Sequence, residues 1–340
     1  MQQILLRLPI PGTERVLTFY GYGAMLCLGF LLAILVAARR AKRLGQSPDV
    51  IYNAALFAFL GGLIGARAFY VIQYGEHFSS VWDLLKIWEG GLTYYGGLLL
   101  AAVGVTGYFA AARLPVLYWS DICAPSLALG LAFGRLGCFV NGCCFGDVCR
   151  SGWGMTWPAG TIPWLHYAEA HVRALNLPAL ADGGAAGGAI IGALAAAWQP
   201  PSIQPMQLAA ALNALLLFAF LCAMFPVKRR HGQILLMFIL LYGVGRFFEE
   251  FLRADEDPIY FFGLGGLLKS LGLAEAASRL PGLTISQNVS IVMVAVAAAG
   301  LVLLARSRRP ELQGTFVPQP APAAKQAGAR RHRHRKDKGP

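Results

Sequence analysis

The sequence predicts an all-α, polytopic integral membrane protein with about seven transmembrane helices. Of its 340 residues, 56% are hydrophobic and only 14% are charged, which leaves too little polar side chain to cover a soluble protein of this size. The mean hydropathy of +0.54 agrees. Apolar runs of about 20 residues recur along the chain, and a helix of that length crosses about 30 Å of hydrocarbon. We place the spans near residues 19–38, 51–73, 95–115, 121–141, 205–226, 232–251 and 286–305.

Basic residues at the ends of alternate spans predict the orientation. The first span ends in a basic cluster at residues 39–43, and positive charge of this kind marks the cytoplasmic side. Arg113 follows the third span, residues 228–230 follow the fifth and residues 306–309 the seventh. The N-terminus is therefore expected outside and the C-terminus in the cytoplasm. The first fifteen residues lack the pattern of a cleavable signal peptide, so we expect the first span to remain in the mature protein.

Composition divides the chain into a membrane-embedded domain, residues 1–309, and a basic cytoplasmic tail, residues 310–340. The tail is rich in Pro, Ala and Gln and then in Arg, and we expect it to be disordered because it lacks apolar residues for a core. Contact of the tail with anionic membrane lipids stays open, and no nucleic-acid partner is expected. Residues 142–204 are predicted as a long external loop. The glycine-rich stretch 183–197 is counted in this loop, since a further span there would move residues 228–230 to the outer side.

Three arginines lie late in spans that run outward, so they share the outer half of the bilayer. These are Arg67, Arg135 and Arg246. An arginine inside a span costs about 2.5–3.5 kcal/mol on insertion scales and therefore indicates a function. Guanidinium groups match phosphate oxygens with two parallel hydrogen bonds. Independent snorkelling explains one or two such residues. Three at one depth favour a site for the phosphate of an outer-leaflet lipid.

Other polar residues reach the same level. Glu250 stands four residues after Arg246 and is positioned to orient its guanidinium, although a purely structural ion pair is the alternative. Tyr20 begins the first predicted span and Tyr95 the third. We include all of them among the candidate substrate-contacting residues.

Residues 134–146 carry the densest group of candidates. Asn141 ends the fourth span that holds Arg135, and Gly142 and Gly146 follow it. Glycines leave the backbone bare, so a bulky ligand or a neighbouring helix can approach closely. We expect these four residues to line the substrate site.

Cysteines cluster in the same segment and just after it. Cys138, Cys143, Cys144 and Cys149 lie at the outer end of the fourth span, where a bacterial envelope permits disulfides. A disulfide of Cys149 with either Cys143 or Cys144 stays open. The external histidines at positions 77, 166 and 171 show no ligand spacing with these cysteines, so we expect neither a metal nor another cofactor.

Together these motifs resemble one known family. Residues 134–146 read Gly-Arg-x-Gly-x-Phe-x-Asn-Gly-x-x-x-Gly, which is similar to the signature of the prolipoprotein diacylglyceryl transferases. Further segments occur in that family's order: Tyr20-Gly21, Gly65-x-Arg67-x-x-Tyr70, Gly90-Gly91-Leu92-x-x-Tyr95-Gly96-Gly97, Asp121 with Pro125, Pro205-x-Gln207-Leu208, Gly245-Arg246-Phe247-x-x-Glu250-x-x-Arg253 and residues 283–287. The resemblance extends from about residue 19 to residue 305.

The resemblance implies an enzyme of the bacterial inner membrane with its active site toward the outer leaflet. Such enzymes transfer the sn-1,2-diacylglyceryl group of phosphatidylglycerol to the lipobox cysteine of preprolipoproteins, forming a thioether and releasing glycerol phosphate. On this resemblance, Arg135 and Arg246 would hold the phosphate and Glu250 would hold one of them. Asn141 and Tyr20 would position the headgroup or the attacking cysteine.

The sequence also departs from the family pattern. Many members carry a histidine, proposed as the base, where this chain has Tyr95, and often Asn and Glu where it has Cys138 and Cys143. The phenol of Tyr95 is a poor base at neutral pH unless a nearby arginine lowers its pKa. The identity of the base, or the need for one, stays open. A non-catalytic phospholipid-binding protein of the same fold is the alternative function. An anion transporter is disfavoured because the cytoplasmic halves of the spans hold little polar beyond Asp121.

Overall fold

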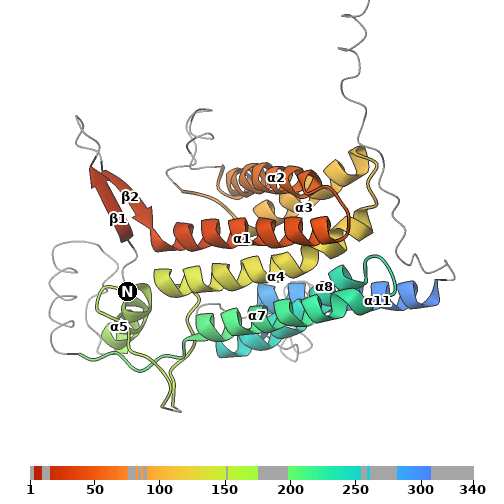
Figure 1. Ribbon diagram of the computed structural model, residues 1–340. Coiled ribbons are helices and arrows are strands. Elements are labelled where there is room, and N and C mark those ends of the chain that lie inside the picture. The colour runs from red at the N-terminus through yellow and green to blue at the C-terminus, as the bar shows by residue number, and fades with distance from the viewer. Residues whose placement is uncertain are drawn as a thin grey trace, which may run out of the picture.

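Long helices running side by side form the bulk of the protein (Figure 1). The computed structural model describes residues 4–9, 16–75, 82, 86, 90–150, 152–174, 198–253, 259–260 and 282–307. The long helices are α1 (Gly21–Arg43), α2 (Asp49–Gln73), α3 (Tyr94–Ala111), α4 (Val116–Asn141), α7 (Met206–Met224), α8 (Gln233–Glu249) and α11 (Ile285–Arg306). Short 3-10 turns follow two of them, η5 (Phe225–Val227) after α7 and η6 (Glu250–Leu252) after α8. The predicted helical membrane fold is confirmed.

Each predicted span has a helix. Within the described ranges, six helices are long and apolar enough to cross a membrane: α1, α2, α3, α4, α7 with η5, and α11. The remaining predicted span, 232–251, is the 17-residue helix α8, which is about 26 Å long at 1.5 Å per residue. The count of seven crossings and their orientation stay predictions. The basic tail and the stretch 183–197 lie outside the described residues, so the predicted domain boundary is also untested.

Two short strand pairs and one further helix complete the described elements. β1 (Ile4–Pro9) pairs antiparallel with β2 (Val16–Tyr20), and β3 (Ile259–Tyr260) pairs with β4 (Gly282–Leu283). The first helix begins at Gly21, two residues after the predicted start, because Tyr20 pairs with Ile4 in the strand ladder. Helix α5 (Ile162–Ala174) lies in the predicted external loop.

Helix α4 is the centre of the bundle. It packs against α1 on one side and against α7 and α8 on the other, while α2 packs on α3 and α8 on α11 (Figure 1). Buried side chains of α4, among them Trp119 and Ile122, meet Phe109 of α3 in one core cluster. Small residues of α4, Ala124 and Ala128, face Leu221 of α7 in another. Helix α4, which carries Arg135, therefore contacts α1, α3, α7 and α8.

Glycines let α2 and α3 approach until their backbones touch. A Cβ at Gly65 would lie 2.3 Å from the carbonyl oxygen of Gly96, and one at Gly61 would lie 2.6 Å from that of Leu100. Close contact through small residues four apart is the usual way in which helices associate in lipid, where apolar surface alone provides no attraction between them.

Gly65→Ala is expected to destabilise this helix pair, whereas Gly62→Ala, one turn away on the same helix, is not. A methyl group at Gly65 meets the backbone of α3 and must push the helices apart. At Gly62 the nearest atoms would be 3.9 Å away, which is ordinary contact. Thermal unfolding in detergent measures both variants, and a typical overpacking cost is about 1–3 kcal/mol. Equal melting temperatures for the two variants would contradict the close packing.

Candidate active site

The C-terminal end of α4 closes in a left-handed turn. Gly142 has φ 79°, and its N–H donates to the carbonyl oxygen of Cys138 at 2.8 Å. The N–H of Cys143 donates to the same oxygen at 3.1 Å. A glycine is favoured here because residues with a side chain rarely adopt this conformation. The predicted site residue Gly142 therefore shapes the turn that follows Asn141.

The segment after this turn is held between two distant parts of the chain. The N–H of Gly146 donates to the carbonyl of Gln204 at 3.1 Å, and that of Asp147 donates to the carbonyl of Leu252 at 3.2 Å. The predicted Gly146 permits this approach, since a Cβ there would lie 2.5 Å from Met206 Cγ. Buried Gln207 donates from Nε2 to the carbonyl of Cys143 at 2.8 Å. These bonds bring the ends of α4, α7 and α8 together.

Arg246 and Glu250 form the predicted ion pair. Both residues are buried, and Arg246 Nη1 pairs with Glu250 Oε2. Arg246 Nη2 also donates to Ser286 Oγ at 2.9 Å. The same Glu250 oxygen is 3.9 Å from Nη1 of Arg253. Glu250 therefore orients Arg246 and supplies negative charge to a second arginine.

Arg135 is held by a residue that sequence reasoning missed. Its Nη2 lies 3.9 Å from Oε2 of Glu249, whose other oxygen accepts a 2.8 Å hydrogen bond from Asn213. Arg135 also interacts electrostatically with Tyr242. Consecutive glutamates at the end of α8 thus serve different arginines: Glu249 faces Arg135 and Glu250 faces Arg246. The sequence feature that could have indicated this contact is the pair of adjacent glutamates at the end of an apolar helix.

Arg67 supports the turn that precedes α3. Its Nη1 donates to the carbonyl oxygens of Gly90 at 2.8 Å and Gly91 at 3.1 Å. The guanidinium carbon is also 5.7 Å from the centre of the Tyr70 ring. These contacts give Arg67 a structural role, because they stabilise the turn before α3. Its contact with substrate stays a prediction.

Two tyrosines close in sequence to the predicted ones also belong to the surroundings of Arg135. Tyr20 and Tyr95 are 57% and 48% exposed, and the ring of Tyr95 packs edge-on against Tyr94 with centroids 5.6 Å apart. Tyr22 and Tyr94 interact electrostatically with Arg135. Tyr22, Tyr94 and Tyr242 therefore join the candidate site, and the sequence did not single them out.

Three cysteine sulfurs converge beside Arg135. The Sγ atoms of Cys138, Cys143 and Cys144 all lie within 4.8 Å of one another, and each residue is partly buried. Cys143 and Cys144 are free thiols, so neither forms the disulfide with Cys149 that the sequence left open. Hydrogen bonds with the thiols of Cys138 and Cys144 lower the pKa of the Cys143 thiol, and Asn141 contributes to the same effect. We call these three residues the thiol cluster.

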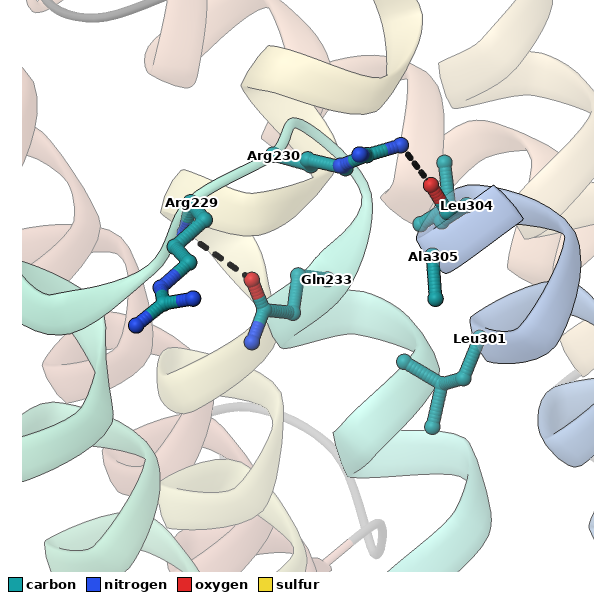
Figure 2. Close-up of a pocket in the computed structure, with 6 residues that line it drawn as sticks. All are labelled: Arg229, Arg230, Gln233, Leu301, Leu304 and Ala305. Carbon is teal, nitrogen blue, oxygen red and sulfur yellow. Dashed lines mark hydrogen bonds between the residues drawn. The ribbon is translucent and has the colours of Figure 1, made fainter. Parts of the chain in front are cut away.

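A pocket at the opposite end of α8 has a structural explanation. It is lined by Arg229, Arg230, Gln233, Leu301, Leu304 and Ala305 (Figure 2). Arg230 donates to the carbonyl oxygen of Leu304, as Figure 2 shows, and to that of Ser307 at 2.7 Å. These carbonyls end α11, so Arg230 stabilises a helix terminus. The candidate site remains at the other end, where Arg135 and Arg246 lie.

Comparison with known proteins identifies the family of this chain. The family profile described as "Prolipoprotein diacylglyceryl transferase" matches residues 13–303. A phosphatidylglycerol–prolipoprotein diacylglyceryl transferase of Xanthomonas euvesicatoria is 33% identical over 322 residues, covering 92% of this chain and 95% of the relative. Proteins of the same name from Geobacter sulfurreducens and Clostridium tetani are 32% and 28% identical, over 74% and 70% of this chain and 86% and 82% of their own. The chain belongs to the prolipoprotein diacylglyceryl transferase family.

Proposed function

We propose that this protein transfers the diacylglyceryl group of phosphatidylglycerol to prolipoproteins, as the names of its relatives state for them. The observation that carries the proposal is the arrangement of two arginines at one end of the helix bundle, each beside its own glutamate. Arg246 is buried with Glu250, and Arg135 faces Glu249. This is a preorganised site for an anionic headgroup.

The chemistry of the transfer matches these groups. The sulfur of the acceptor cysteine attacks the glyceryl carbon that bears the phosphate ester. A carbon–sulfur bond forms, the carbon–oxygen bond to phosphate breaks, glycerol phosphate leaves with the electron pair, and the thiol proton is released. Negative charge grows on the phosphate oxygens during this step, so fixed guanidinium groups stabilise the transition state more than the ground state.

The two arginines are suited to different parts of this task. Arg246 is fixed by Glu250 and Ser286, so we assign to it the static contact with the phosphate. Arg135 keeps 18% of its side chain exposed, which leaves it accessible to a ligand. We further propose that Asn141, Tyr20 and Tyr95 help to position the headgroup or the acceptor cysteine.

The proposal includes a location and an acceptor. The site would face the outer leaflet of the bacterial inner membrane, and the acceptor would be the lipobox cysteine at the end of a preprolipoprotein signal peptide. The positive-inside pattern supports this orientation, because Arg39 to Arg43 lie at the end of α1 opposite the candidate site.

The test is transfer by the purified protein in detergent, with phosphatidylglycerol and a lipobox peptide. A peptide heavier by the diacylglyceryl group, together with released glycerol phosphate, is the expected result. A peptide with serine in place of the lipobox cysteine is the matched control and should stay unmodified. Bound phosphatidylglycerol without any product would instead identify a non-catalytic lipid-binding protein and overturn the proposal.

A further inference from the structure

The thiol cluster is built by the backbone and does not depend on chance side-chain positions. Cys138 lies in the last turn of α4, and two backbone bonds to its carbonyl turn the chain back after Asn141. Cys144 has φ 58°, a left-handed conformation that costs a residue with a side chain roughly 1–2 kcal/mol. The buried Gln207 fixes the intervening carbonyl of Cys143. The fold thus maintains an unfavourable conformation at the position that completes the cluster.

The geometry is close to that of a zinc site. Zn–S bonds of about 2.3 Å in a tetrahedron place the sulfurs about 3.8 Å apart. The sulfurs here lie within 4.8 Å of one another, so side-chain rotations that close the gap by about 1 Å suffice. A ligand set made only of sulfur selects soft or borderline ions such as zinc. Zinc sites with three protein ligands keep the fourth position open and are typically catalytic.

The cluster also has the neighbour that such a site needs. Cys138 follows Arg135 by three residues on α4, so the two side chains share one helix face. Arg135 interacts electrostatically with both Cys138 and Cys144. Its positive charge offsets the negative charge that three thiolates leave on the zinc complex. Because Arg135 is also the proposed phosphate contact, the thiol cluster adjoins the proposed phosphate site.

We propose that Cys138, Cys143 and Cys144 bind one Zn²⁺, and that the open fourth position takes the sulfur of the acceptor cysteine during transfer. The proposal rests on the proposed function and deepens it. A thiol that coordinates zinc gives up its proton, which passes to solvent. The zinc-bound sulfur then attacks the glyceryl carbon, the carbon–oxygen bond breaks, and glycerol phosphate leaves with the electron pair. No oxidant or reductant is needed, and the reaction no longer needs a protein base to deprotonate the acceptor.

Metal binding is measured first, independently of turnover. Protein purified under reducing conditions is expected to bind one equivalent of zinc, and cobalt in its place should show sulfur-to-cobalt charge-transfer absorption. Cys143→Ser and Cys144→Ser should each weaken zinc affinity at least tenfold. Cys27→Ser is the matched control, since Cys27 is an exposed thiol of α1, and it should bind as the unchanged protein does. Zinc should raise the melting temperature of the control and not of the cluster variants.

Turnover separates failure of this inference from failure of the proposed function. Removing zinc with a chelator is expected to lower the transfer rate at least a hundredfold, and Zn²⁺ but not Mg²⁺ should restore it. Full-rate transfer by the zinc-free protein would overturn the zinc proposal and leave the transferase intact. No transfer by protein that holds zinc would overturn the proposed function. Three results would overturn the zinc site itself. They are the absence of zinc binding, a disulfide between two of the three cysteines after purification, and equal zinc affinity in the serine variants.

Discussion

Arg135→Ala is expected to lower kcat/KM for diacylglyceryl transfer by about 10²–10³-fold, which is the usual effect of removing one fixed donor from a site where negative charge develops. Arg135 is the more accessible of the two arginines, with 18% of its side chain exposed, and its ion pair with Glu249 spans 3.9 Å. That long contact leaves the guanidinium free to tighten on a phosphate. The assay is transfer from phosphatidylglycerol to a lipobox peptide at varied lipid concentration.

Two further variants make the result specific. Arg135→Lys keeps the positive charge and loses the planar fork, so an intermediate loss is expected if two-pronged phosphate binding matters. Arg306→Ala removes an arginine in the last turn of α11, at the opposite end of the bundle, and should leave transfer unchanged. Normal turnover by Arg135→Ala would remove the phosphate-binding role of this residue.

Arg246→Ala is expected to change both activity and stability, so its result is harder to interpret. Its partner Glu250 is buried and would keep the 3.9 Å contact with Arg253 as its described ion pair. Breaking a buried pair by removing one member typically costs about 3–5 kcal/mol. Lost activity in this variant would therefore combine a missing phosphate contact with a destabilised protein, and its melting temperature must be measured beside its rate.

The helices were predictable because the membrane imposes a length and a composition on every span. The two strand pairs were not, since the strands are only two to six residues long and no alternation of polar and apolar residues marks them. Their apolar residues also continue directly into α1, so no change in composition marks the boundary at Gly21. A hydropathy pattern does not predict a boundary between two elements that is set by backbone hydrogen bonds.

The end of the helix bundle at which these residues gather was predictable, but the direction of a side chain was not. The sequence placed Arg135, Arg246 and Glu250 at one level, and the structure joins the last two as expected. The sequence did not indicate that Glu249 contacts Arg135. Adjacent residues on a helix point about 100° apart, and which of the two glutamates faces Arg135 depends on the helices that α8 contacts. The same uncertainty separates Tyr94 from Tyr95 on α3.

The thiol cluster shows the same limit in a loop. Spacing alone grouped Cys138, Cys143, Cys144 and Cys149, and it left a disulfide with Cys149 open. Which thiols meet depends on left-handed conformations at Gly142 and Cys144, and no sequence rule predicts the second of these. The expectation of no metal relied on the absence of paired histidines. Three cysteine sulfurs form a set of metal ligands without any histidine.

Asp121→Ala is expected to lower the free energy of unfolding by about 3–5 kcal/mol, the typical cost of leaving one member of a buried ion pair behind. The Asp121 carboxylate is fully buried and accepts a 3.0 Å hydrogen bond from Lys228 Nζ. It also accepts from the backbone N–H groups of Gly232 at 2.9 Å and Leu235 at 3.0 Å. These two N–H groups belong to the start of α8, where the helix itself offers no partner for them. A residue of α4 thus caps α8 and joins the two helices that carry Arg135 and Arg246.

The same variant tests the transporter alternative, because Asp121 was the polar residue that a path through the cytoplasmic half would need. All the contacts described for its carboxylate hold α8 and Lys228 in place, so the transfer rate per folded molecule should stay unchanged while the melting temperature falls. Asp49→Ala is the control: it removes an exposed acid of the first turn of α2, which accepts a 2.9 Å hydrogen bond from Ser47 Oγ. It should leave the transfer rate unchanged and lower the free energy of unfolding by no more than about 1 kcal/mol. A variant with normal stability and lost function would give Asp121 a direct part in the reaction or in a polar path. A fall in stability alone would leave it as the support that keeps the arginine-bearing helices in register.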